Sequence, residues 1–208
     1  MNPYIQRAIN YANGVLDGSI SACDYKILEA KRFLRDIENP KFYLNEEVIN
    51  ISINFIEKVV VHYQGESVKA VSLRNRPMKL QEWQMFVVVN VMGFYKTGTI
   101  ETRFKEAMVF LPRKQGKTAF TASLALCKSL IERMSSSKCY IVANSIKQSL
   151  EAFGFIRYNV ERWKDKRISI KDNNSEHSIT GDFGKDGSFF VQALANDESR
   201  LDALNGNF

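Results

Sequence analysis

The sequence contains few of the residues that build disulfide-linked or metal-binding folds. Only three cysteines occur among its 208 residues, and no two of them have the C-x-x-C spacing. Its two histidines, His62 and His177, lie far apart and have no cysteine partner at ligand spacing. A disulfide framework and a zinc site are therefore disfavoured, and a reducing compartment is indicated.

Long apolar runs are also missing. The first residues, MNPYIQRAINYANG, lack the short apolar centre of a signal peptide. No segment reaches the roughly 18 consecutive apolar residues that a membrane-spanning helix needs. We therefore expect a protein of the cytoplasm with no membrane partner.

The composition is that of a globular protein with a core. Hydrophobic residues make up 45% of the chain and charged residues 25%, and the length suits one domain, with or without a small appendage. The formal net charge is +6. This excess suits a polyanion such as nucleic acid, but it also suits many plain soluble proteins.

The first third of the chain has helical periodicity. Apolar residues recur every three or four positions in residues 4–15, 27–37 and 49–63. Residues 67–79 are polar and contain four basic residues and no acid. We therefore expect a helical N-terminal appendage over residues 1–66 and a main domain over residues 67–208.

The main domain alternates between two periods. After a predicted helix at residues 78–94, short apolar runs at residues 107–111 and 139–143 predict buried strands. Residues 118–134 and 146–164 predict helices, and residues 168–170 and 188–193 predict short strands, with a turn between Thr180 and Gly187. This order predicts an α/β fold of the P-loop NTPase type, with a parallel sheet flanked by helices.

A candidate phosphate-binding loop follows the first predicted strand, in MVFLPRKQGKTAFTASLALCKSL (residues 108–130). A helix N-terminus offers free N–H groups and a positive dipole end to a phosphate. Gly116 allows close backbone approach, Lys117 can reach the β- and γ-phosphates, and the Thr118 hydroxyl can join the shell of Mg²⁺. Leu111 stands where such loops usually open with glycine. The intervening residues are Pro112, Arg113, Lys114 and Gln115.

The alternative is a surface Gly-Lys-Thr sequence that only caps a helix. Three-residue matches are common, but an upstream apolar run, a downstream amphipathic helix and a second buried strand favour the phosphate loop. Arg113 and Lys114 add positive charge beside the phosphates.

The loop PRKQGKT, with LQEWQ about 30 residues upstream, resembles the large terminase subunit of tailed bacteriophages, the ATP-driven motor that packages DNA. That family commonly has an arginine at the place of Arg113, no opening glycine, and a Trp-Gln pair like Trp83-Gln84. IVANSIKQSLEAF is similar to its next strand and helix. ANDESRLDALNG is similar to the segment before its acidic strand, although Ala203 and Gly206 depart from the usual Gly and Pro. The resemblance covers residues 79–208.

The resemblance implies roles for individual residues. Lys117 and Thr118 would bind the phosphates of ATP and Mg²⁺, and Arg113 would stabilise the γ-phosphate. Gln84 would read the adenine edge, because an amide can donate and accept at once. Trp83 either packs beside the base or is a core aromatic. The other nucleotide contacts would be Pro112, Lys114, Gln115 and Gly116.

The same resemblance implies partners and a location. These are double-stranded DNA, the small terminase subunit, the portal protein and further copies in a homo-oligomeric ring, in the cytoplasm of an infected bacterial host. The full-length protein would also cut DNA with a C-terminal endonuclease domain.

An acidic strand is not recognisable in the sequence. ATP hydrolysis of this type needs an acid that holds Mg²⁺ and a carboxylate that orients water. The only Asp-Glu pair, Asp197-Glu198, lies in a polar stretch, and we interpret it as unrelated to that motif. In the family the acidic strand would begin just past residue 208. We therefore expect the front part of a longer protein, with an incomplete sheet, no nuclease domain and negligible hydrolysis on its own.

Two other functions stay open. One is a helicase-like or other DNA-translocating P-loop ATPase, and the second is a non-enzymatic fragment that binds DNA or a partner. Residues 157–171 contain six basic residues and two acidic ones. They fit a solvated helix face about as well as a surface that follows DNA phosphates.

Overall fold

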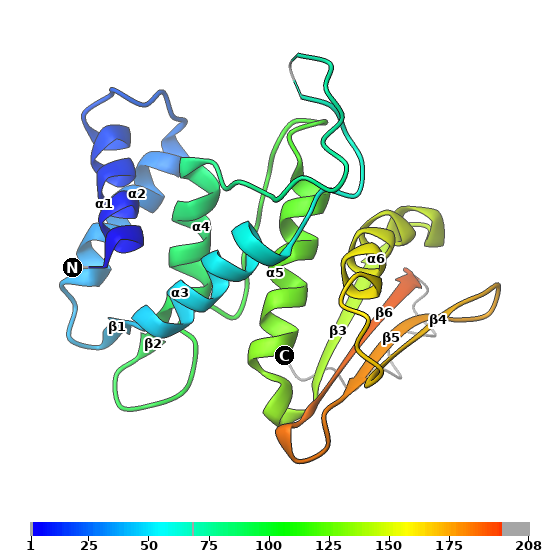
Figure 1. The fold of residues 1–208 in the computed structure, drawn as a ribbon. Coiled ribbons are helices and arrows are strands. Elements are labelled where there is room, and N and C mark those ends of the chain that lie inside the picture. The colour runs from blue at the N-terminus through cyan, green and yellow to red at the C-terminus, as the bar shows by residue number, and fades with distance from the viewer. Residues whose placement is uncertain (1, 68, 197–208) are drawn as a thin grey trace. The chain divides into compact units, whose positions relative to one another are not determined.

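The computed structural model describes residues 2–67 and 69–196, which form a mixed α/β protein (Figure 1). Packing divides the chain into two compact units. Unit 1 contains Met1–Glu57 and Lys79–Val109, and unit 2 contains Lys58–Met78 and Phe110–Phe208. Because the units are defined by packing alone, the expected boundary of an ATPase domain between residues 66 and 67 stays a prediction.

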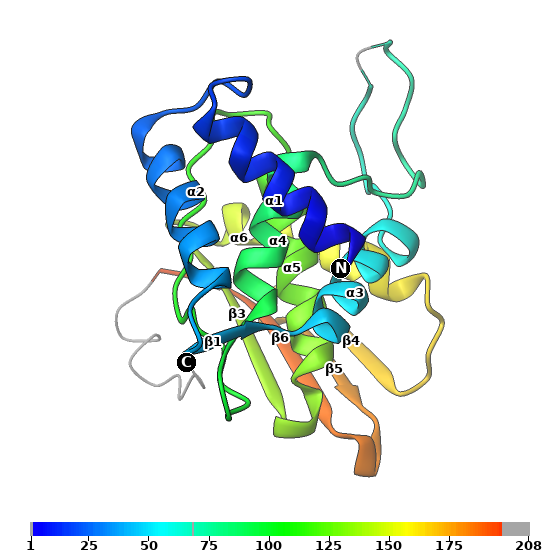
Figure 2. The same cartoon turned by 90° about the vertical axis from the view of Figure 1, so that its left-hand side faces the viewer.

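Unit 1 is a helical bundle with a small two-stranded sheet. Its elements are α1 (Pro3–Leu16), α2 (Asp24–Ile37), β1 (Phe42–Leu44), α3 (Glu46–Asn54), α4 (Glu82–Gly93) and β2 (Phe94–Lys96). Figure 2 shows α1 and α2 side by side, and α1 and α3 also contact α4. β1 and β2 pair antiparallel. The predicted helical first third of the chain is therefore confirmed.

The apolar stripe of α3 faces the core of unit 1. Ile49, Ile53 and Ile56 are inaccessible to solvent, and α3 continues into one π-helical turn, η1 (Phe55–Val59). Asn45 caps the helix, because its side-chain oxygen accepts a hydrogen bond from the first turn.

α4 is apolar on nearly all sides and forms the centre of unit 1. All residues from Gln84 to Asn90 are buried, as expected of a helix with no polar face. The run of three valines at residues 87–89 is therefore helical, in spite of the preference of β-branched residues for strands. The predicted helix over residues 78–94 is confirmed, with its start at Glu82.

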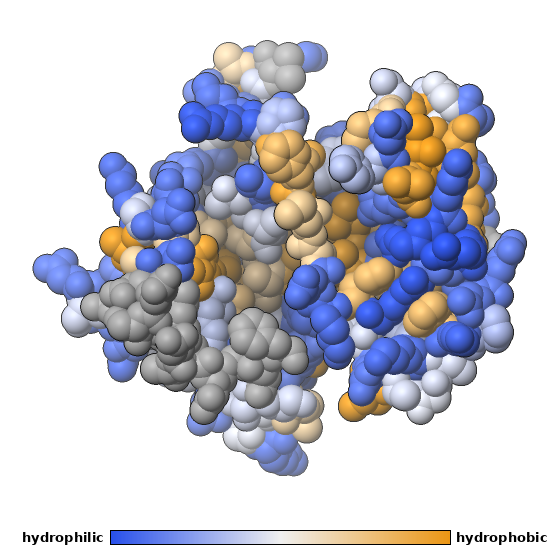
Figure 3. Space-filling view, turned by 180° about the vertical axis from the view of Figure 1, so that it is seen from behind, coloured by the Kyte–Doolittle hydropathy of each residue, from blue (hydrophilic) through white to orange (hydrophobic). Residues whose placement is uncertain are grey.

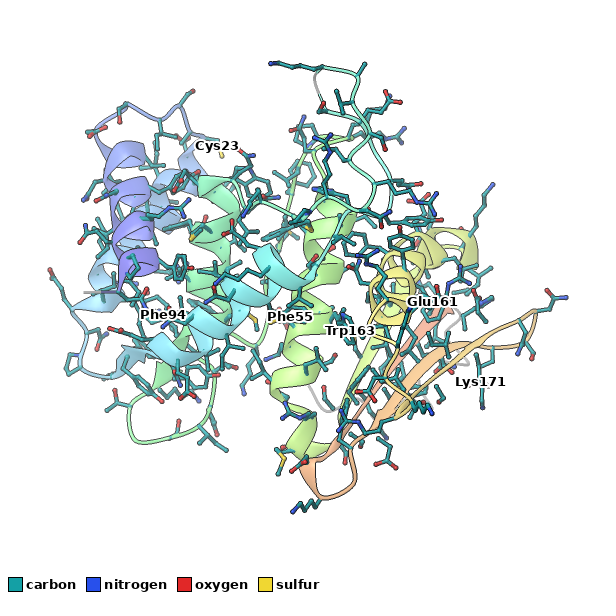
Figure 4. The ribbon with its side chains drawn as sticks, viewed as in Figure 1. Cys23, Phe55, Phe94, Glu161, Trp163 and Lys171 are labelled. Atoms are coloured by element: carbon teal, nitrogen blue, oxygen red, sulfur yellow. The ribbon has the colours of Figure 1, made fainter. Side chains whose placement is uncertain are left out.

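A buried ion cluster joins the two chain segments of unit 1. Asp36 on α2 is 1% exposed and forms salt bridges with Arg32, at 3.6 Å, and with Arg103. Burial lowers the pKa of Arg32 below its ordinary value. The guanidinium of Arg103 also lies over the rings of Phe42 and Phe94; Phe94 is labelled in Figure 4. Arg103 thereby ties the segment after β2 to the helical bundle.

Unit 2 places two helices against a four-stranded sheet. Its elements are α5 (Lys117–Ile131), η2 (Arg133–Ser135), β3 (Ser137–Ala143), α6 (Ile146–Glu161), β4 (Ile168–Asp172), β5 (His177–Asp182), η3 (Gly184–Asp186) and β6 (Ser188–Ala195). The strand order is β3-β6-β5-β4. α5 and α6 both contact β3 and β6, and Phe120, Phe153 and Phe189 lie in the core.

The sheet is mixed, so the prediction of a parallel sheet is only partly right. β3 and β6 are parallel, with Ser137 opposite Phe189, whereas β5 pairs antiparallel with both β6 and β4. The predicted turn between Thr180 and Gly187 joins β5 to β6 as a hairpin, and a tight hairpin allows only antiparallel neighbours. Gly187 has a φ of 89°, and a β-carbon there would lie 2.2 Å from the carbonyl oxygen of Arg133.

The predicted strand at residues 107–111 is wrong. Residues 106–112 have no helix or strand, and the side chains of Met108 and Phe110 are 93% and 92% exposed. An apolar run becomes a strand only when a neighbouring edge accepts its backbone hydrogen bonds. Among the described residues, β3 pairs on one edge alone, with β6. The run at residues 107–111 therefore has the residue types of a strand, but no strand among the described residues pairs with it.

The face drawn in Figure 3 carries many hydrophilic side chains, with hydrophobic groups between them. No helix in the described part of the chain has the length and apolar character to cross a membrane.

Candidate nucleotide site

The loop at residues 112–116 leads directly into α5. Gly116 precedes the helix with a φ of 72° and a ψ of 14°, in the left-handed region. A β-carbon on Gly116 would meet no atom within 4 Å, so the backbone conformation, not lack of space, requires glycine. Lys114 has a positive φ as well, 65°. The chain thus turns sharply just before Lys117 begins the helix.

The N-terminus of α5 is open to an anion. Its first backbone hydrogen bond runs from the N–H of Phe120 to the carbonyl of Gly116, at 3.0 Å. Gly116 has no side chain to cap the helix, and no hydrogen-bond acceptor among the described residues is found for the N–H groups of Lys117 and Thr118. These groups and the positive end of the helix dipole suit a phosphate.

Three cations surround this helix end. Arg113, Lys114 and Lys117 are exposed, and within the described part of the chain none of them forms a salt bridge. By contrast, Lys128, further along α5, pairs with Glu132 at 2.6 Å. Uncompensated positive charge therefore gathers at the loop and not along the rest of the helix.

Thr118 is the residue best suited to Mg²⁺ at the loop. It is exposed in the first turn of α5, and a hydroxyl oxygen fits an ion that keeps most of its waters. No group of three or more His, Cys, Asp or Glu side chains that could hold a metal occurs among the residues described. The pair Asp197-Glu198 lies outside the described residues.

Trp83 and Gln84 lie in the first turn of α4, in unit 1. Gln84 is 7% exposed, and its side-chain oxygen accepts a hydrogen bond from the N–H of Gln81 at 2.9 Å. The side chain of Gln81 accepts in return from the N–H of Gln84, which makes a capping box. Trp83 is half-buried. Gln84 therefore already has a structural role at the start of α4.

A polar hairpin lies beside the loop within unit 2. We call residues 61–67 and 69–77 the arm. Its two sides are joined by backbone hydrogen bonds, among them His62 to Arg76 and Leu73 to Gly65, both 2.9 Å. The arm and Lys114 line an open cavity of about 890 Å³. Sequence reasoning treated this segment as a connection, because a hairpin held by isolated bridges leaves no periodic apolar signal.

Comparison with known families shows which family the chain belongs to. The family model for the ATPase domain of the terminase large subunit matches residues 82–208, more than half of the chain. The chain belongs to the terminase large subunit family. The predicted resemblance is thereby confirmed, and the chain has the ATPase role of that subunit. Neither the curated proteins nor the solved structures gave a match.

The matched region of the terminase ATPase domain includes candidate residues from each unit. It begins at the first residue of α4 and contains Trp83, Gln84, the loop at residues 112–116 and all of the four-stranded sheet. Helices α1 to α3 and the arm precede it. The arm therefore lies outside the residues that the family match covers.

Proposed function

We propose that this domain is a P-loop ATPase whose ATP hydrolysis drives double-stranded viral DNA into a prohead. One observation carries the proposal: Gly116, in a left-handed conformation, places Lys117 and Thr118 at an uncapped helix N-terminus in a chain of the terminase family. An anion held there meets backbone donors, the helix dipole and three cations together.

Each residue of the loop has a separate task in this proposal. Lys117 donates to the β- and γ-phosphates, and Arg113 stabilises charge that develops on the γ-phosphate. The N–H groups of the loop and of the first turn of α5 orient the phosphate chain. Pro112, Lys114 and Gln115 give the loop its shape. Thr118 would hold Mg²⁺, which neutralises phosphate charge when bound.

Gln84 would donate its amide N–H to the adenine edge, with Trp83 beside the base. The oxygen of Gln84 is already an acceptor for Gln81, so its nitrogen is the better-placed group for a ligand.

The proposed biological setting is that of terminase large subunits. The proposed partners are double-stranded DNA, the small terminase subunit and the portal protein, with copies of the subunit in a ring in the cytoplasm of an infected bacterium. A C-terminal nuclease would act in the full-length protein. The excess of positive charge, +6 overall, supports a polyanionic substrate.

The test is nucleotide binding by a Lys117→Ala variant. Losing a charge-assisted contact should cost about 2 kcal/mol, or roughly thirtyfold in affinity for Mg·ATP. Lys128→Ala is the matched control, because Lys128 lies on the same helix and pairs with Glu132. Isothermal titration calorimetry measures both, with circular dichroism to check the fold.

Unchanged affinity in Lys117→Ala would remove the loop from the site. Absence of any ATP binding by the wild-type chain would favour the non-enzymatic DNA- or partner-binding function. The family match favours a terminase over a helicase-like ATPase.

A further inference from the structure

A small pocket lies in unit 2 at the end of α5 that is remote from the phosphate loop. Its lining residues come from the last turn of α5, from the segment between α6 and β4, and from the turn around η3. α5 has 15 residues, so about 20 Å of helix separates the pocket from Gly116. We call it the distal pocket, because it is separate from the nucleotide loop.

The backbone around the distal pocket is held together by close packing and hydrogen bonds. Gly187 follows η3, and a β-carbon there would lie 2.2 Å from the carbonyl oxygen of Arg133. The turn before β6 is therefore pressed against the end of α5. On the other side, the N–H of Asp182 donates to the carbonyl of Arg167 at 3.0 Å. The walls of the pocket are thus fixed before any ligand arrives.

The interior of the distal pocket is apolar. Leu130, Trp163, Ile168 and Phe183 line it and are half-buried, and Trp163 is labelled in Figure 4. The ring of Phe183 stacks on the buried ring of Phe189, with centroids 6.0 Å apart. The volume is about 270 Å³, just below the roughly 300 Å³ of the smallest drug-sized sites. The pocket therefore suits one ring or one aliphatic side chain.

Two arginines line the distal pocket, and only one of them is paired with an acid. Arg167 donates to the carboxylate of Asp165 at 2.7 Å and 2.9 Å, which lowers the pKa of Asp165 to about 2. The charges of this pair offset each other. Arg133 donates to the carbonyl of Leu130 at 2.8 Å, and it has no salt bridge to any residue that the structure describes. Arg133 therefore brings a positive charge that is not neutralised.

The chain around the distal pocket adds further positive charge. Lys164, Lys166 and Lys185 are sequence neighbours of the lining residues and are exposed. None of the three forms a salt bridge within residues 2–67 and 69–196. Together with Arg133 they outnumber the nearby acids Asp182 and Asp186. The surroundings of this apolar pocket are therefore complementary to negative charge.

An apolar pocket with a positive rim fits a protein segment better than a DNA duplex. A duplex offers phosphates to the rim, but its bases are stacked inside, and turning one base out costs a few kcal/mol. An acidic protein segment offers carboxylates to the rim and an exposed side chain to the pocket together. Aromatic side chains that fill a pocket are also the usual anchors of protein interfaces.

We propose that the distal pocket receives one aromatic side chain from an acidic segment of a partner protein. The ring packs against Trp163 and Phe183, and the carboxylates of the segment lie near Arg133 and the flanking lysines. The inference goes beyond the proposed nucleotide function and does not depend on it, because the phosphate loop lies at the other end of α5.

The experiment uses short peptides as probes, with the whole chain as the binding protein. The first probe is a fluorescently labelled peptide with one phenylalanine between two aspartates and two glutamates. Fluorescence anisotropy should show binding to the wild type. A peptide with alanine in place of phenylalanine should bind about tenfold more weakly. A peptide with asparagine and glutamine in place of the acids should also bind more weakly, and salt should reduce that difference.

Variants of the protein assign the binding to the distal pocket. Trp163→Leu should weaken the phenylalanine peptide about tenfold, whereas Trp163→Phe keeps a ring and should retain most of the affinity. Arg133→Gln should weaken the acidic peptide and leave its neutral counterpart unchanged. Arg76→Gln is the matched control for charge, since Arg76 is an exposed arginine elsewhere in unit 2. It should change neither affinity. Circular dichroism shows whether each variant folds.

Several results would overturn the inference. One is no binding of the phenylalanine peptide by the wild type up to about 1 mM, and another is equal affinity for the phenylalanine and alanine peptides. Neither result requires a variant to fold. A folded Trp163→Leu variant with wild-type affinity is a third.

Two further results would assign the distal pocket to another occupant and so also overturn the inference. In the first, a DNA duplex displaces the peptide from the wild type and binds Trp163→Leu more weakly. In the second, sedimentation velocity shows self-association of the wild type that Trp163→Leu abolishes, which would make the occupant a second copy of the chain.

Discussion

At the scale of single residues, Gly116 and Gln84 show two kinds of candidate site residue. Gly116 is needed for its backbone conformation, with a φ of 72° and open space around it. The sequence predicted a glycine here for close backbone approach to a phosphate, whereas its left-handed conformation is a finding of the structure. Gln84 carries a capping bond that the Trp-Gln pair does not indicate.

Gln84→Ala should affect both ATP and the start of α4. The lost adenine contact should weaken ATP by about 1 kcal/mol, with less effect on tripolyphosphate. The lost capping bond should also lower the free energy of unfolding by about 1 kcal/mol. Titration with both ligands and urea unfolding measure the two effects.

Gln81→Ala is the matched control for Gln84→Ala. It removes the other half of the capping box without touching the proposed base contact. If the two variants weaken ATP equally, Gln84 acts only through the start of α4.

At the scale of elements, α6 organises unit 2. It contacts β3, β5 and β6, and it also holds the arm through Asn159 and Tyr158. Asn159 bonds the backbone of Phe155 within its own helix as well. One helix therefore connects the sheet to the wall of the cavity.

Asn159→Ala should destabilise unit 2 and loosen the arm. The variant leaves the N–H and carbonyl groups of Val61 without their partner, at a cost of about 2 kcal/mol in the free energy of unfolding. Urea unfolding gives that value, and hydrogen exchange should rise in residues 61–77. Asn10→Ala, at an exposed helix position, is the comparison and should change little. Unaltered exchange in the arm would show that Asn159 does not anchor it.

The strands illustrate which elements a sequence can predict. β3 was predicted from an apolar run and β6 as a short strand, and both form. The run at residues 107–111 has the same character and does not form a strand. The strand β5 was missed, because its centre reads Ser-Ile-Thr-Gly with little alternation. A run forms a strand when a neighbouring strand has a free edge to pair with, and that neighbouring strand is distant in sequence.

At the scale of the whole molecule, each unit is built from separate stretches of chain. In unit 1 the stretch Lys79–Val109 packs with the stretch Met1–Glu57. The salt bridge between Asp36 and Arg103 is one link between these two stretches. A buried ion pair adds little net stability compared with apolar residues, but removing one partner leaves the other charge unpaired.

Asp36→Asn should therefore lower the free energy of unfolding by about 3 kcal/mol. The comparison is Glu132→Gln, which breaks the exposed pair with Lys128 and should cost less than about 1 kcal/mol. Urea unfolding followed by circular dichroism measures both variants. If both variants lose a similarly small part of the free energy of unfolding, the charges of the Asp36 cluster are screened by solvent as in a surface pair.

The sequence by itself determined the features that depend on neighbouring residues. These are the helices, which follow from apolar period and capping residues, and the loop, which follows from the glycine, lysine and threonine before a helix. The motifs in the sequence were also enough to recognise the resemblance to terminases, which the family match confirms.

Only the tertiary structure decided the features that join distant residues. These are the mixed strand order, the Asp36 cluster, and the arm that α6 holds beside Lys114. Periodicity reports which face of an element is apolar, but it does not say which other element covers that face or accepts its hydrogen bonds. That choice is made by long-range packing and by the pairing of buried polar groups, neither of which leaves a local pattern in the chain.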